Sequence, residues 1–319
     1  MSEDKSTQVC ETDFDIKNKK IKETIQLENV KKIVFGGGFL KGYSLLGCIK
    51  YLIENSINKQ ITTIIGSSAG ALCATCLCLD YSIKDIDYLV KELNFTDYEN
   101  FSTENILNFT VHFGLDDGNK MIQLIKKIIA YKTKNCYITF SQLYKQNCKT
   151  LVITGTNLKT RCCEYFSHIT TPDMPIWLAL RISISFPIFY NKVEYNNNHY
   201  IDGAASSSCA IEFIEDIMKE TIDDTLCVIL FNMKSLEKKK TDKPSVNEYY
   251  SFYNYMMDLM SSLRFQDMNR FKKYKYNLLD IDVNFEMYKS NIKLEEKMFL
   301  FEKGYEKIKD FFSKDSEFN

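Results

Sequence analysis

Near the start of the chain, short apolar runs alternate with stretches of helical periodicity. Residues 31–35 form an apolar run that ends in glycines, and residues 61–65 are almost all β-branched, so both segments predict buried strands. Residues 41–54 place their apolar side chains at helical spacing, and residues 69–79 predict a second helix. This strand–helix–strand–helix order predicts a mostly parallel α/β sheet that is covered on both faces.

The rest of the chain continues the mixed pattern. Further helices are predicted over residues 83–93, 119–131, 174–184, 246–265 and 294–312, and further strands over 151–154, 162–166, 200–201 and 225–231. Residues 1–28 lack clear periodicity, which predicts a flexible leader before one domain that spans residues 29–315.

One uncharged segment, residues 61–79, is long enough to imitate a membrane span. It contains Gly66, Ser67, Ser68 and Gly70, however, together with three threonines. A buried strand, a tight turn and a buried helix explain this composition better than a transmembrane helix does.

Composition narrows the class of protein. The chain has 319 residues, 45% of them hydrophobic, which is enough for a substantial core. Lys and Arg number 41 against 42 Asp and Glu, so no basic excess indicates a nucleic-acid partner. The first twenty residues are polar, and the eleven cysteines do not form a disulfide-framework pattern. We therefore expect a cytoplasmic protein with reduced thiols that is not secreted.

The turn between the second strand and the second helix carries a candidate nucleophile. Gly66-Ser67-Ser68-Ala69-Gly70 fits G-x-S-x-G, and it lies where a nucleophile elbow must lie. Ser68 would project from the start of the helix, where unpaired N–H groups favour a developing negative charge. A tight, strained turn there would need the flanking glycines. The alternative is a helix-capping serine in a glycine-rich turn.

A glycine loop follows the first strand. Gly36, Gly37, Gly38 and Phe39 precede Lys41-Gly42, and their backbone N–H groups suit an oxyanion hole at the same sheet edge as the serine. The dinucleotide-binding pattern does not fit, because it needs a glycine at the position of Lys41. The phosphate-loop pattern does not fit either, because its lysine must follow the last glycine, whereas Lys41 precedes Gly42. Glycines that only permit a close turn remain the other reading.

The positions of the three histidines limit which residue can act as the base for Ser68. His112, His168 and His199 all precede Asp202, so a serine–acid–histidine order that uses this aspartate is excluded. If its strand is extended, His199 points away from the face of Asp202. A Ser68–Asp202 dyad remains, with the carboxylate as general base. Taken alone, Asp202-Gly203 is usually just a turn.

Taken together, these three motifs resemble those of patatin-like phospholipases in type, order and spacing. The resemblance covers residues 33–210 and includes the segment 178–187 before the aspartate. It implies a three-layer α/β/α sandwich with a mostly parallel central sheet, and an enzyme that needs no metal or organic cofactor.

The resemblance also implies roles for individual residues. Ser68 would attack a carboxylic ester of a phospholipid or lysophospholipid, and Asp202 would take its proton. The backbone of Gly37, Gly38 and Phe39 would hold the oxyanion. The residues that support the motifs are Gly36, Lys41, Gly42, Gly66, Gly70 and Gly203.

Phe39 departs from the family pattern, which usually has a small residue there. Phenylalanine can narrow the acyl entrance or require a backbone conformation that disfavours a side chain. Two alternatives to the hydrolase therefore remain open. One is an acyltransferase or transacylase on the same dyad, and the other is a catalytically impaired lipid-binding protein.

Several remaining features have plain structural explanations. Cys73-x-x-Cys76 lies inside a predicted helix with no second pair, so a core role is favoured over metal or redox chemistry. The basic loop 234–243 is expected to be solvated, and the Tyr- and Met-rich helix 246–265 to be packed in the core. The lipid substrate implies peripheral contact with membranes. The oligomeric state is not predicted.

Overall fold

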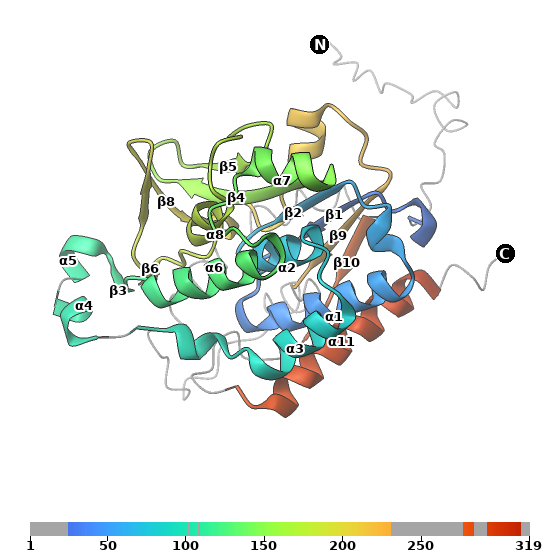
Figure 1. The fold of residues 1–319 in the computed structure, drawn as a ribbon, viewed down its shortest axis with the longest axis horizontal. Helices are drawn as coiled ribbons and strands as arrows, with labels where there is room; N and C mark the ends of the chain where they lie inside the picture. Colours follow the sequence, from blue (N-terminus) through green and yellow to red (C-terminus); the bar gives the residue numbers. More distant parts are fainter. Residues whose placement is uncertain (1–24, 101, 108, 231–276, 284–291, 314–319) are drawn as a thin grey trace, which may run out of the picture.

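A twisted, mostly parallel sheet forms the centre of the molecule in a computed structural model that describes residues 25–100, 102–107, 109–230, 277–283 and 292–313 (Figure 1). The strand order is β10-β9-β1-β2-β4-β8-β7, and β5 also pairs with β4, outside this order. The strands are β1 (Lys32–Phe35), β2 (Thr63–Gly66), β4 (Thr150–Asn157), β5 (Cys162–Phe166), β7 (Val193–Tyr195), β8 (Asn198–Asp202), β9 (Thr225–Ile229) and β10 (Leu278–Asp280).

The five strands from β10 to β4 run parallel to one another, whereas β5, β8 and β7 pair in antiparallel fashion. A separate small sheet pairs β3 (Gly114–Asp116) with β6 (Ile188–Tyr190). The predicted α/β architecture is therefore confirmed, with an antiparallel extension at one side of the sheet.

Both faces of the parallel strands are buried. On β1, Ile33 and Phe35 join the larger hydrophobic cluster, while Val34 points to a second cluster on the opposite face. On β9, Val228 and Cys227 divide in the same way. This explains why these strands read as continuous apolar runs and show no alternation of apolar and polar residues.

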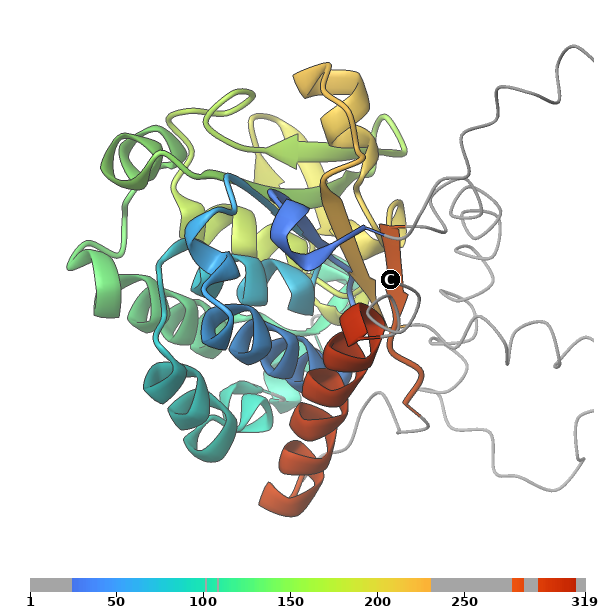
Figure 2. The ribbon, with the colours of Figure 1, turned by 90° about the vertical axis from the view of Figure 1, so that its right-hand side faces the viewer.

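Helices cover the face of the larger cluster (Figures 1 and 2). The helices are α1 (Gly42–Glu54), α2 (Ala69–Cys78), α3 (Ile83–Glu92), α4 (Thr103–Leu107), α5 (Phe109–His112), α6 (Asn119–Thr133), α7 (Phe140–Asn147), α8 (Ile176–Ser183) and α11 (Leu294–Ser313). On the opposite face, the described part of the covering layer is the segment 209–222, which contributes Ile211, Phe213 and Ile214 to the second cluster.

The membrane-like segment 61–79 is strand β2, a turn and helix α2, as its glycines and serines predicted. Within the described ranges, no helix has both the length and the apolar content needed to cross a bilayer. The predicted helix 246–265, the basic loop 234–243 and residues 1–24 of the predicted leader lie outside the described residues. Residues 25–28 do lie inside them, and Ile25 is buried.

Strand β4 is longer than its neighbour β2, and this difference positions the site. Gly66, the last residue of β2, lies opposite Ile153 of β4. Strand β8 pairs with the part of β4 that extends further, and Asp202 lies opposite Gly155. Since Gly155 is two residues beyond Ile153 and Ser68 is two residues beyond Gly66, the register of β4 brings Ser68 and Asp202 to the same level.

Helix α1, which begins at the glycine loop, is held by a close crossing with α11, seen side by side in Figure 2. Glycines permit this approach. A Cβ atom on Gly304 would overlap the carbonyl oxygen of Ser44, and one on Gly47 would overlap that of Phe301. The Cys48 thiol also lies 3.3 Å from the Gly304 carbonyl oxygen. The two helix backbones are therefore in direct contact.

This crossing predicts the effect of a small substitution. Gly304→Ala should lower the free energy of unfolding by about 1–3 kcal/mol, because the added methyl group must push α11 away from α1. Chemical denaturation measures the change. Glu302→Ala, at a nearby exposed position of α11, is the control and should change stability little. Equal stability of the Gly304→Ala and unmodified chains would contradict the packing argument.

Candidate active site

Ser68 lies in a strained turn between β2 and α2. Its backbone has φ 55° and ψ −126°, a conformation that non-glycine residues rarely adopt. Although Ser68 occupies the capping position of α2, its side chain makes no capping hydrogen bond. The helix-capping alternative is therefore wrong, and the hydroxyl is directed elsewhere.

The glycines that flank Ser68 serve a different purpose from the one that the sequence suggested. Neither Gly66 nor Gly70 has a positive φ, so the strained conformation falls on the serine itself. A Cβ atom on Gly70 would overlap the Phe35 carbonyl oxygen, and one on Gly66 would overlap the backbone of Gly70. The glycines are needed for close approach of the backbone segments.

The carboxylate of Asp202 accepts a hydrogen bond from the hydroxyl of Ser68. The distance from Ser68 Oγ to Asp202 Oδ2 is 2.6 Å across 134 positions of sequence, and both residues are buried. The other carboxylate oxygen accepts the N–H of Ala204 at 2.8 Å. A distance of 2.6 Å between Ser68 Oγ and Asp202 Oδ2 is typical of a charge-assisted O–H···O bond. The carboxylate is therefore placed to receive a proton from the serine.

Backbone contacts fix the aspartate from both sides. Its N–H donates to the Ser185 carbonyl oxygen at 2.9 Å, and its carbonyl oxygen accepts the Thr156 hydroxyl at 2.8 Å. Gly203 is required next to it, because a Cβ atom there would overlap Thr154. The Thr154 hydroxyl in turn donates to the Ser67 hydroxyl at 2.8 Å, which joins β4 to the serine turn.

The glycine loop packs directly against the pair. A Cβ atom on Gly37 would lie 2.8 Å from that of Ala204 and 3.1 Å from that of Ser68. Among the described residues, none accepts a hydrogen bond from the backbone N–H of Gly37 or Gly38. A Cβ atom on Gly36 would lie 2.9 Å from the Ser208 carbonyl oxygen. All three segments that the sequence singled out therefore meet at one place.

Phe39 and Lys41 complete the loop in different ways. Phe39 has φ 52°, a backbone conformation that disfavours a side chain, as was expected for a non-glycine residue at this position. Lys41 ends the 3₁₀ turn Phe39–Lys41 and is half-buried; burial lowers the pKa of its amino group, against the opposing effect of Asp282 and Asp280. Gly42 begins α1 and lies against Ala69.

An apolar cavity of about 80 Å³ opens beside Ser68. Its lining combines the glycine loop, the start of α2 and strand β6, and comprises Phe39, Leu40, Ser68, Ala69, Leu72, Phe95, Glu99, Met121, Ile184, Phe189 and Tyr190. A second cavity of about 30 Å³ shares Phe39, Ala69, Leu72 and Phe95 and reaches Cys73 and Cys76. The space is narrow and mostly apolar, with Ser68 and Glu99 among its lining residues.

Two serines at the end of α8 were not recognised from the sequence. Ser183 Oγ accepts the N–H of Ser68 at 2.9 Å, and the Ser185 carbonyl oxygen accepts the N–H of Asp202. One short segment thus holds both members of the pair. It belongs to the stretch 178–187 that carried part of the family resemblance, and this was the signal that could have identified it.

Arg181 of α8, which is also buried, anchors this segment. Its guanidinium donates to the Ser185 hydroxyl and to the carbonyl oxygens of Asp117 at 3.1 Å and Asn191 at 3.2 Å. Those two residues follow β3 and β6. The arginine therefore connects the end of α8 to the small sheet at the rim of the cavity.

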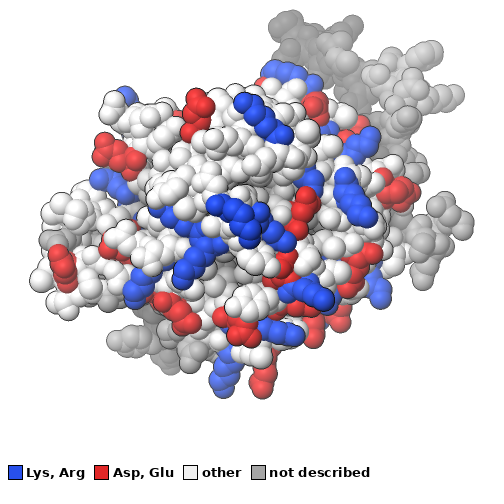
Figure 3. Space-filling view, in the orientation of Figure 1, with Lys and Arg blue, Asp and Glu red and all other residues white. Residues whose placement is uncertain are grey.

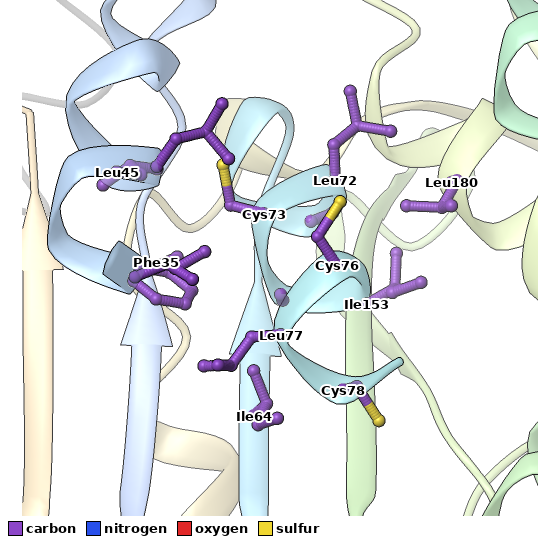
Figure 4. Packing of buried hydrophobic residues seen from close by; sticks show 14 of the residues in the cluster. Phe35, Leu45, Ile64, Leu72, Cys73, Cys76, Leu77, Cys78, Ile153 and Leu180 are labelled. Atoms are coloured by element: carbon purple, nitrogen blue, oxygen red, sulfur yellow. The ribbon is translucent and has the colours of Figure 1, made fainter. Parts of the chain in front are cut away.

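The C-x-x-C pair lies in the core behind the site. Cys73 and Cys76 are buried among Leu45, Leu72 and Leu180 (Figure 4), and burial raises the pKa of Cys76 to about 12. A thiol with so high a pKa is a poor nucleophile and a poor metal ligand. No cluster of three or more His, Cys, Asp or Glu side chains with metal-binding geometry occurs in the described part of the chain.

All three histidines are described, and none of them lines the cavity beside Ser68. His199 is exposed on β8 while Asp202 is buried, which agrees with the predicted opposite directions of their side chains. His168 stacks on Tyr144 with ring centroids 3.7 Å apart.

Comparison with known proteins agrees with the motifs. The family model described as "Patatin-like phospholipase" matches residues 33–213, which is more than half of the chain. The chain belongs to the patatin-like phospholipase family.

Relatives occur among viruses. The chain is 31% identical over 298 residues to uncharacterized protein R571 of Acanthamoeba polyphaga mimivirus, covering 91% of this chain and 95% of that protein. It is 29% identical over 235 residues to probable lipid hydrolase 463L of Invertebrate iridescent virus 6, covering 70% and 76%. The crystal structure of VipD from Legionella pneumophila shares the fold, with a TM-score of 0.58 at 16% identity over 94% of this chain and 72% of that one.

The contact between Ser183 and the serine turn predicts a stability effect. Ser183→Ala should lower the free energy of unfolding by about 1–3 kcal/mol, because the buried N–H of Ser68 loses its acceptor. Ser44→Ala is a matched control, since Ser44 is equally buried and its hydroxyl has no partner among the described residues. Chemical denaturation should show a loss for the first variant only; equal effects would rule out the special role of Ser183.

Proposed function

We propose that the chain hydrolyses carboxylic esters of phospholipids or lysophospholipids with Ser68 as nucleophile and Asp202 as general base. The membership of the patatin-like phospholipase family and the likeness to a probable lipid hydrolase support a lipid-hydrolysing enzyme. The observation that carries the finer proposal is the 2.6 Å hydrogen bond between the two side chains beside an apolar cavity.

The proposed first half-reaction forms an acyl-enzyme. Ser68 Oγ attacks the ester carbonyl carbon while its proton passes to Asp202 Oδ2. When the tetrahedral intermediate collapses, the alcohol of the glycerol backbone leaves and takes that proton from Asp202. In the second half-reaction, a water molecule gives a proton to the same carboxylate and attacks the acyl group. The fatty acid then leaves, and the proton returns to Ser68.

The oxyanion of both tetrahedral intermediates would be held by backbone N–H groups of Gly37, Gly38 and Phe39. Gly37 is in contact with Ser68, and its amide N–H has no acceptor among the described residues, which is the arrangement that an oxyanion hole requires. Fixed donors of this kind act strongly because the surroundings are apolar.

The substrate class follows from the cavity. Its lining residues are apolar apart from Ser68, Glu99 and Tyr190, so it suits the hydrocarbon chain of a fatty acyl ester. Since phospholipids reside in bilayers, we further propose that the protein is cytoplasmic and contacts membranes peripherally.

Substitution of the pair tests the proposal. Ser68→Ala and Asp202→Asn should each lower ester hydrolysis by several orders of magnitude, roughly the loss seen when a nucleophile or its base is removed. A fluorophosphonate probe should label the unmodified chain on Ser68 and leave Ser68→Ala unlabelled.

His199→Ala is the matched control, because His199 is exposed on the same strand as Asp202. It should retain full turnover. Equal hydrolysis by all variants would refute the dyad. Product analysis with a lysophospholipid acceptor separates hydrolysis from acyl transfer: the proposal expects free fatty acid as the main product, and a predominantly acylated acceptor would identify a transacylase.

Phe39 predicts a change of specificity. Phe39→Ala should raise turnover of long-chain esters relative to short-chain esters by about tenfold, because removing the ring widens the apolar cavity. Turnover of a chain-length series measures the ratio, which does not depend on enzyme concentration. Phe299→Ala, at an exposed position on α11, serves as control. An unchanged ratio in Phe39→Ala would show that this ring does not limit the acyl chain.

A further inference from the structure

The segment that contains α4 and α5 carries exposed apolar side chains. Leu107, Val111 and Phe113 expose 77%, 63% and 55% of their surface. Figure 1 shows α4 and α5 extending away from the rest of the molecule beside β3 and β6, and the same end of the surface is mostly uncharged in Figure 3. Apolar side chains that point into water at one projecting end mark an interaction surface.

Both ends of this projection begin at the rim of the cavity. Before it, Glu99 lines the cavity, and the N–H of Asn100 donates to Asp116. After it, β3 pairs with β6, which contributes Phe189 and Tyr190 to the lining. The projection is therefore fixed to the mouth of the proposed acyl site from two sides.

One lysine contacts an apolar side chain of the projection, and another lies at its base. The Lys192 amino group is 5.4 Å from the centre of the Phe113 ring, and Lys120 donates to the Glu99 carbonyl oxygen at 3.0 Å. Helix α6, which starts just after β3, contains lysines but no acidic residue. Acidic residues also occur in this region, namely Glu104 on α4, Glu99 at the cavity and Asp117 after β3. Apolar side chains flanked by lysines match the acyl chains and the phosphate groups of a lipid surface.

We propose that the projection, residues 103–107 and 109–113, is the membrane-docking element of this protein. Leu107, Val111 and Phe113 enter the region between headgroups and acyl chains, and the mouth of the cavity then faces the lipid surface. The inference rests on the proposed function for its physiological meaning, because an acyl ester must leave the bilayer to reach Ser68. Binding to a lipid surface can nevertheless be measured without any hydrolysis.

The test uses the full chain and the double variant Leu107→Asp/Val111→Asp. Both side chains are exposed, so the fold should be unaffected, and thermal unfolding checks this without relying on activity. The matched control is Leu158→Asp/Ile169→Asp, two exposed apolar positions near the β4–β5 hairpin. Vesicles of phosphatidylcholine with about one quarter phosphatidylserine provide the lipid surface.

The unmodified chain and the control should sediment with these vesicles, and the projection variant should bind at least about tenfold more weakly. Its hydrolysis of vesicle phospholipid should fall in parallel, while turnover of p-nitrophenyl butyrate, a soluble ester, stays within about twofold of the unmodified chain. Equal vesicle binding by all three proteins overturns the inference. Failure of the unmodified chain to sediment also overturns it, and points to a protein partner for this surface.

The two proposals fail differently. If the unmodified chain hydrolyses neither vesicle phospholipid nor p-nitrophenyl butyrate but still binds vesicles through the projection, the proposed activity is wrong and the docking element stands. If hydrolysis of the soluble ester requires Ser68 but vesicle binding does not change in the projection variant, the docking element is wrong and the dyad stands.

Discussion

The hydrogen bond from Ser68 Oγ to Asp202 Oδ2 is the interaction on which the site depends. It joins the end of a parallel strand, β2, to the end of an antiparallel strand, β8. The two strands do not pair with each other. Both are placed by β4, whose extra length carries β8 past the point where β2 ends. The position of the pair is therefore a consequence of sheet register.

Burial of the pair has to be compensated locally. A carboxylate withdrawn from water is costly unless its oxygens accept hydrogen bonds, and Asp202 accepts one from the Ser68 hydroxyl and one from the Ala204 N–H. The strained backbone of Ser68 needs support as well, and the hydroxyl of Ser183 accepts its N–H. The strand ends bring Ser68 and Asp202 together, and the segment at the end of α8 stabilises them in this position.

Much of this could be predicted from the sequence. Strands β1, β2 and β9 are buried on both faces, so their apolar runs were visible without any tertiary information. The three motifs were recognisable because glycine is required where backbones touch. Helix α7 was missed, although Thr139 and Gln142 form a capping box that signals its start.

Other features of the structure depend on contacts between distant parts of the chain, which a local sequence pattern cannot show. Strands β3, β6 and β7 have three residues each, too few to show a period, and β3 exists only because β6 lies beside it. The acceptor role of Ser183 depends on contact between residues 115 positions apart. Apart from its place in the stretch 178–187 that resembles the family, no local pattern distinguishes this serine from any other in a helix.

Phe39 shows how the cavity mouth and the site restrain each other. A positive φ at a non-glycine residue costs on the order of 1–3 kcal/mol. The Phe39 ring contacts those of Phe186 and Phe189 edge-on, with centroids 4.9 Å and 6.3 Å away, and each such pair contributes about 0.5–1.5 kcal/mol beyond its buried area. The two amounts are of similar size, so aromatic packing against Phe186 and against Phe189 of β6 can hold the glycine loop in its strained shape.

Since β6 also pairs with β3, the loop that approaches Ser68 and the projection of α4 and α5 are connected through one small sheet. A displacement of β6 would therefore move the Phe39 ring and both ends of the projection together. The physical link between the outer surface and the serine is this chain of backbone pairing and ring contact.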